Sequence, residues 1–97
     1  MESATMKDVC VHLLIEGRVQ GVGFRYFALK CAQKLNVTGW VRNNFDGTVE
    51  IEVEGDRSAV EEYIAKIKLG PTWGNVKDLS VEYKSYEGKY SSFEVTR

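Results

Sequence analysis

The order in which the apolar residues change their spacing constrains the fold of this chain more than any other feature. A period of two comes first, in Val9, Val11, Leu13 and Ile15. Spacings of three and four follow it, in Phe24, Phe27, Ala28, Cys31 and Leu35. The first pattern is typical of a strand with one face on a core, and the second gathers its residues on one stripe of a helix that ends near Asn36.

The next two strands are predicted to form a hairpin. Residues 37–43 are rich in side chains that suit a pleated surface, and residues 48–54 alternate apolar side chains with glutamate. Asp46 and Gly47 lie between them, a pair that favours a turn. We therefore expect the two segments to pair through a slightly longer hairpin loop.

A second helix is predicted after the hairpin. Its apolar stripe comprises Val60, Tyr63, Ile64 and Ile67. Ser58 and Glu61 have the spacing of a capping box, and Asp56 is an alternative cap. Gly70 and Pro71 are expected to end the helix.

Two more strands, over residues 76–83 and 92–96, complete a βαββαβ order with a short C-terminal edge strand. Two helices can cover only one face of a sheet. The economical arrangement is therefore a two-layer α+β sandwich of ferredoxin-like type, with an antiparallel sheet and both helices on one face. The length suits a single domain over residues 1–97, in which residues 1–7 form a flexible N-terminal tail.

Charge and composition exclude several classes of partner. The formal net charge of −1 gives no general attraction for nucleic acid or anionic lipid. No apolar stretch approaches the length of a membrane span and the N-terminus lacks a signal-peptide pattern, which favours a cytoplasmic protein without a membrane partner. A single histidine and the distant Cys10 and Cys31 are too few ligands for a metal site. We expect no metal, no cofactor and no disulfide.

The stretch GRVQGVGFR, which joins the first strand to the first helix, is longer than that connection requires. Gly21 and Gly23 let a ligand approach main-chain N–H groups, and the positive end of the helix dipole faces the same space. Arg25, in the first helical turn, can offer two donors to a phosphate. The pattern indicates an anion cradle, with a plain connector and a solvated arginine as alternatives.

Two nucleotide-binding loops do not fit this stretch. A Walker A loop ends in Gly-Lys followed by Ser or Thr, where this chain has Gly23-Phe24-Arg25. The dinucleotide fingerprint requires a third glycine where Tyr26 stands. Neither ATP nor NAD is therefore indicated.

GRVQGVGFR and the later GWVRNNFDGTVE resemble the motifs of the acylphosphatase family, and the resemblance extends to the closing SSFEVTR. It implies an enzyme that hydrolyses the carboxyl-phosphate bond of a small acyl phosphate without a metal, and we expect a monomer. It also implies that backbone N–H groups wrap the phosphate, that Arg25 holds its oxygens and that Asn43 orients the attacking water. The implied phosphate-binding loop consists of Arg18, Val19, Gln20, Gly21, Val22 and Gly23.

The residues around Asn43 have other expected roles. Asn43 ends its strand, whereas Asn44 opens the turn. By strand period, Arg42 points to the opposite face as a surface or pairing residue. Trp40 and Phe45 are expected to be packing residues.

A binding module for RNA shares the βαββαβ order and is the main alternative. Such modules stack bases on aromatic side chains of the exposed strand face, where this chain places Glu50, Glu52 and Glu54, and three carboxylates repel a phosphate backbone. A catalytically silent module of the family is a second alternative, against which the intact motifs argue. His12 lies on the face opposite the core and is not expected to act in catalysis. By resemblance to the family, whose C-terminus does so, the C-terminal Arg97 could approach the site through the last strand.

Overall fold

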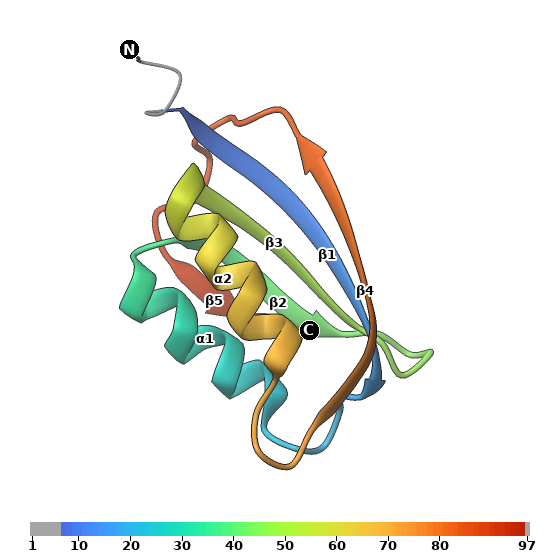
Figure 1. Cartoon of the computed structure of the whole chain (residues 1–97). Coiled ribbons are helices and arrows are strands. Elements are labelled where there is room, and N and C mark those ends of the chain that lie inside the picture. The colour runs from blue at the N-terminus through green and yellow to red at the C-terminus, as the bar shows by residue number, and fades with distance from the viewer. Residues whose placement is uncertain (1–6, 97) are drawn as a thin grey trace.

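The computed structural model describes residues 7–96. It contains seven regular elements, which Figure 1 shows in chain order. They are β1 (Asp8–Arg18), α1 (Phe24–Leu35), β2 (Thr38–Asn43), β3 (Val49–Asp56), α2 (Arg57–Leu69), β4 (Asn75–Lys84) and β5 (Phe93–Val95). Their types and order are those predicted from the sequence. Residues 1–6, which make up most of the expected tail, and Arg97 lie outside the described residues. Neither helix in the described part is long and apolar enough to cross a membrane.

The five strands form one sheet in the order β4-β1-β3-β2-β5. β1 pairs antiparallel with both β3 and β4, and β2 pairs antiparallel with β3. β5 pairs with β2 in parallel, so the expectation of a wholly antiparallel sheet is wrong at this edge. The reason is that the chain leaves β4, crosses to the far edge of the sheet through residues 85–92, and enters β5 in the same direction as β2.

Both helices lie on one face of the sheet, and the core lies between these two layers (Figure 1). The largest fully buried core side chains are Tyr63, Phe24, Leu13, Ile15, Ile51 and Ile67. The Tyr63 hydroxyl donates to the carbonyl oxygen of Ala28 at 3.1 Å, which joins α2 to α1. Phe24 is the first residue of α1, so its burial fixes where the N-terminus of that helix lies. Cys31 is a core residue, as predicted, and its thiol is free.

The N-terminus of α2 is capped by Asp56. Its carboxylate accepts hydrogen bonds from the backbone N–H groups of Ser58 at 3.1 Å and Ala59 at 3.2 Å. The capping box of Ser58 and Glu61 is therefore wrong, because Ser58 already lies inside the helix. The Ser58 hydroxyl instead donates to the same carboxylate, and this hydrogen bond, with those from the backbone, lowers the pKa of Asp56.

The face of the sheet opposite the helices is partly covered by residues 85–92. Glu54 accepts hydrogen bonds from two backbone N–H groups of this segment, each at 3.1 Å, and the Tyr90 hydroxyl donates to Glu52 at 2.6 Å. Glu52 and Glu54 are therefore buried, and the expectation that they belong to an exposed acidic row is wrong. Cys10 lies beside them, where burial raises the pKa of its thiol to about 11 and the two carboxylates add to the effect. This thiol stays protonated near neutral pH.

Candidate active site

The connection from β1 to α1 contains two glycines with left-handed backbone conformations. Gly21 has a φ of 74° and Gly23 a φ of 77°, values at which a residue with a Cβ is strained. A Cβ added to either glycine would meet no atom within 4 Å. The glycines are therefore needed for the shape of the backbone, and the space beside them is open to a ligand.

The N-terminus of α1 has no capping side chain. Gly23 is the N-cap residue, and no acidic residue lies in the first turn. Within residues 7–96, the backbone N–H groups of residues 21–26 donate to no protein acceptor. In α2, by contrast, Asp56 occupies the first N–H groups. The first turn of α1 thus combines unpaired donors with the positive end of the helix dipole, the combination that binds anions.

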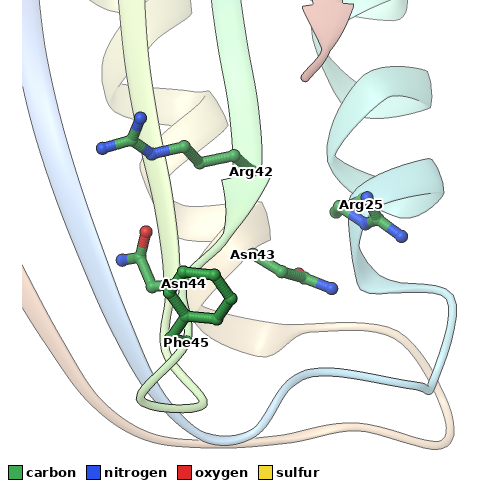
Figure 2. Close-up of a pocket in the computed structure, with 5 residues that line it drawn as sticks. All are labelled: Arg25, Arg42, Asn43, Asn44 and Phe45. Atoms are coloured by element: carbon green, nitrogen blue, oxygen red, sulfur yellow. The ribbon is translucent and has the colours of Figure 1, made fainter. Parts of the chain in front are cut away.

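Two side chains from separate elements line the space in front of this N-terminus. Arg25 is the second residue of α1, and Asn43 is the last residue of β2, as predicted. Figure 2 shows the Asn43 side chain pointing from the end of its strand toward the first turn of α1. Its Oδ1 is buried and has no hydrogen-bond partner in the described part of the chain. Because an unpaired buried acceptor is costly, this oxygen suits a partner from outside the chain, such as water.

Arg25 carries a charge that the rest of the described chain does not compensate. Arg42 and Arg57 each form an ion pair with a glutamate, but no carboxylate of residues 7–96 lies at ion-pair distance from Arg25. A cation at the positive end of a helix dipole is also unfavourable. An anion bound beside Arg25 would relieve both conditions, so its position favours an anionic ligand.

Gln20 joins the loop to the hairpin between β2 and β3. Its side-chain amide donates to the carbonyl oxygens of Asn44 at 2.7 Å and Thr48 at 2.8 Å. Those two residues also pair with each other, since the Asn44 N–H donates to the Thr48 carbonyl at 2.9 Å. The loop and the strand end that carries Asn43 are therefore held together. The Gln20 side-chain amide is occupied by these contacts, so its role in the described chain is to hold the loop against the hairpin.

Two adjoining hollows converge on Arg25 and Asn43. The smaller hollow, of about 370 Å³, is lined by Val19, Gly21, Gly23, Phe24, Arg25, Tyr26, Asn43 and Val95. The larger hollow, of about 660 Å³, is lined by Arg25, Arg42, Asn43, Asn44 and Phe45 (Figure 2). The smaller hollow contains the glycine turn and the helix N-terminus, so it is the one that presents the unpaired donors.

Only some of the site residues that the resemblance implies line the smaller hollow. Its lining includes Arg25 and Asn43, and from the loop Val19, Gly21 and Gly23. The other three loop residues do not line it. Arg18 ends β1, Val22 packs against the core, and the Gln20 side chain contacts the hairpin.

Tyr26 and Val95 line the smaller hollow and Phe45 lines the larger one, but the sequence did not predict any of these three as site residues. Tyr26 follows Arg25 in the first helical turn, so the helix start could have placed it at the rim. Val95 reaches the smaller hollow because β5 runs parallel to β2, a pairing that no local signal specifies. Arg97, two residues further on, lies outside the described residues. The expectation that Phe45 packs is wrong, because the tip of the hairpin extends beyond the core and leaves this ring fully exposed.

His12, Glu50 and Arg42 form a hydrogen-bonded group on the other face of the sheet, and of these three only Arg42 also lines the larger hollow. His12 Nε2 lies 2.5 Å from one carboxylate oxygen of Glu50, and the other oxygen accepts hydrogen bonds from Arg42 Nε at 3.0 Å and Nη2 at 2.8 Å. Burial alone would raise the pKa of Glu50, but the hydrogen bonds from His12 and Arg42 outweigh it and lower the pKa. Arg42 is thus a pairing residue, as predicted, and Figure 2 shows its guanidinium directed away from Arg25.

The donors around the smaller hollow suit an anion. They are backbone N–H groups, a guanidinium and a side-chain amide, all of which offer hydrogen to an oxyanion. In the part of the chain that the structure describes, no three His, Cys, Asp or Glu residues gather to hold a metal ion.

The element order and the strand order place this protein in the class of ferredoxin-like α+β sandwiches. A family model described as Acylphosphatase matches residues 11–95. An acylphosphatase of Syntrophotalea carbinolica is 48% identical over 90 residues, which cover 93% of this chain and 98% of that relative. The chain belongs to the acylphosphatase family, and it is an enzyme that hydrolyses acyl phosphates.

Solved structures share this architecture. The acylphosphatase from Bacillus subtilis matches with a TM-score of 0.89 and 36% identity, over 92% of this chain and 99% of that one. Full-length HypF, in a phosphate- and nucleotide-bound form, matches with a TM-score of 0.87 and 32% identity. That match covers 99% of this chain but 13% of HypF, so the same fold also occurs as a small part of a longer protein.

Proposed function

We propose that the smaller hollow binds the phosphate group of the acyl phosphate. Backbone N–H groups of the Arg18–Gly23 loop and of the first turn of α1 surround the phosphate, and Arg25 donates two charge-assisted hydrogen bonds to its oxygens. The observation that carries this proposal is the uncapped N-terminus of α1 beside an arginine without an ion-pair partner in the described chain. The match to acylphosphatases over most of the chain supports it.

Asn43 orients the water that attacks the phosphorus atom. Its amide is not basic near neutral pH, so it cannot remove a proton from the water. Its Oδ1 can accept a hydrogen bond from the water and its Nδ2 can donate one to water or phosphate, which together fix the direction of attack. The buried Oδ1 without a partner in residues 7–96 supports this role.

The reaction needs little chemistry from the protein beyond this positioning. A bond forms between the water oxygen and phosphorus, and the bond from phosphorus to the carboxyl oxygen breaks. A carboxylate is already a good leaving group, so a general acid is unnecessary. Phosphoryl transfer passes through a loose transition state in most analyses, and catalysis then consists mainly of positioning and of stabilising charge on the phosphate oxygens. Backbone N–H groups, Arg25 and Asn43 can supply both.

The remaining properties that we propose concern partners and location. The enzyme works without a metal as a single-domain monomer in the cytoplasm, on small acyl phosphates, and it has no nucleic-acid or membrane partner. The hydrogen-donating character of the site supports metal-free binding of an anion, and the net charge of −1 gives no general attraction for nucleic acid.

Hydrolysis of benzoyl phosphate in ¹⁸O-labelled water that contains EDTA tests this mechanism. The label should appear in inorganic phosphate and not in benzoate, because water attacks phosphorus. Asn43→Ala should lower kcat by about 10²-fold with a small change in KM, since a misplaced nucleophile costs about that much. The matched control is Asn75→Ala, an exposed asparagine at the start of β4 that lines neither hollow.

Three outcomes would contradict the proposal. Label in benzoate would mean that water attacks the carbonyl carbon. Complete loss of wild-type activity in EDTA would refute the metal-free mechanism. A kcat for Asn43→Ala equal to that of Asn75→Ala would show that Asn43 does not orient the attacking water.

A further inference from the structure

The larger hollow continues the phosphate site on the side away from the glycine turn. The two hollows share Arg25 and Asn43, and only the larger one extends over Asn44 and Phe45 of the hairpin. An acyl phosphate has two parts joined by one oxygen. If its phosphate lies in the smaller hollow, its acyl group can extend past the shared residues Arg25 and Asn43 into the larger hollow. Its volume of about 660 Å³ is that of a small-molecule pocket.

Phe45 is the aromatic residue of this larger hollow, and the hairpin does not need it. The turn is held by Asn44, Asp46 and Thr48: the Asn44 side chain donates to the Thr48 hydroxyl at 2.9 Å, and the Thr48 N–H donates to Asp46 at 3.0 Å. Phe45 takes part in none of these hydrogen bonds, and its ring is fully exposed. An isolated exposed ring gives no free energy of burial until something covers it.

The charges around the larger hollow favour an uncharged occupant at the end far from the phosphate. Arg42 also lines this space, but Glu50 accepts two hydrogen bonds from its guanidinium and compensates its charge. The guanidinium is also stacked on Trp40, with 5.2 Å between its carbon and the ring centre. Among the residues that are described in the lining of this hollow, a carboxylate on the acyl group would therefore find no uncompensated cation besides Arg25, which the phosphate already occupies.

We propose that the larger hollow receives the acyl group and that Phe45 determines specificity by covering apolar, above all aromatic, acyl groups. This inference rests on the proposed phosphate site, since that site decides where the acyl group begins. Contact between Phe45 and an aromatic ring removes apolar surface of both from water. An acetyl group offers one methyl and gains much less.

The test compares kcat/KM for benzoyl phosphate and acetyl phosphate in wild type and Phe45→Ser. The value for benzoyl phosphate should fall about tenfold, which is what partial burial of a phenyl ring contributes, and the value for acetyl phosphate about twofold or less. Phe45→Tyr keeps the ring and should keep the wild-type ratio of the two substrates. Trp73→Ser is the matched control, because Trp73 is also a highly exposed aromatic residue but lines neither hollow.

Competitive inhibition by inorganic phosphate separates this inference from the phosphate site itself. Phe45→Ser should leave the inhibition constant unchanged, whereas Arg25→Gln should raise it. If Arg25→Gln leaves it unchanged, the proposed phosphate site fails. The other result is that phosphate inhibition behaves as stated while Phe45→Ser leaves the ratio of kcat/KM for benzoyl phosphate to kcat/KM for acetyl phosphate at the wild-type value. That result would overturn the role of Phe45 in specificity.

Discussion

Replacement of Arg25 by glutamine should lower activity while raising stability. Two charge-assisted hydrogen bonds to phosphate, at about 1.5–3 kcal/mol each, would be lost. Because Arg25 is half-exposed, water screens these contacts and the lower end applies, about 3 kcal/mol, which is about 10²-fold in kcat/KM. In the free enzyme, however, the same change removes a cation from the positive end of a helix dipole, which should raise the free energy of unfolding by about 0.3–1 kcal/mol.

Both effects can be measured on the same protein samples. The loss of benzoyl phosphate gives kcat and KM in EDTA, and urea unfolding with and without inorganic phosphate gives stability. Arg57→Gln is the matched control, because it removes an arginine from the first turn of α2, where the partner is an exposed Glu61 at 3.3 Å. Its activity should remain at the wild-type value.

Two outcomes would refute this prediction for Arg25. If Arg25→Gln hydrolyses benzoyl phosphate at the rate of Arg57→Gln, Arg25 does not hold the phosphate. If Arg25→Gln is less stable than wild type without phosphate, its charge is compensated in the free enzyme and the electrostatic argument for an anion site is wrong. Phosphate should stabilise wild type more than the variant, since it binds the folded state more tightly there.

Two further predictions concern stability. Tyr63→Phe removes the hydrogen bond to Ala28 and should lower the free energy of unfolding in urea by about 0.5–1.5 kcal/mol with little change in KM; an unchanged urea midpoint would contradict it. Burial alone would raise the pKa of Glu52, but hydrogen bonds from Tyr90 and Lys84 outweigh it and lower the pKa. A lowered folded-state pKa gives stability above the unfolded value of about 4.3 that is lost as the pH falls through the folded pKa. Glu52→Gln should therefore lose less stability than wild type between about pH 6 and about pH 3, and equal losses would refute this role of Glu52.

Local periodicity predicts most of the fold because each element buries one face. The spacing of Val9 to Ile15 and of Phe24 to Leu35 reports directly which face is buried, and the structure has β1 and α1 there. The alternation of Phe93 and Val95 also predicts the strand at β5, but the parallel pairing of β5 with β2 depends on how residues 85–92 cross the sheet. The same crossing covers Glu52 and Glu54. Alternation predicts which face a side chain occupies, but it does not predict what lies over that face.

The site divides in the same way between local and tertiary signals. Arg25 and Asn43 could be predicted because a helix start and a strand end are local features that the two motifs mark. The amide contacts of Gln20 join segments 24 and 28 residues apart, and nothing in either segment specifies the pairing. Val95 lines the smaller hollow for the same tertiary reason as the pairing of β5. Phe45 was expected to pack because it is apolar, but the turn around it is complete without it.

The two helices begin at equivalent strand-to-helix crossings, and their different N-termini connect fold to function. At α2 a carboxylate occupies the first N–H groups, whereas at α1 these groups have no acceptor in the described chain and an arginine stands beside them. An absent N-cap typically costs about 0.5–2 kcal/mol, and a cation there adds to the cost. The buried Phe24 and the Tyr63 hydroxyl hold α1 in place by other means. The donors of α1 can therefore stay unpaired in the free enzyme, and a bound phosphate would supply the cap that the sequence omits.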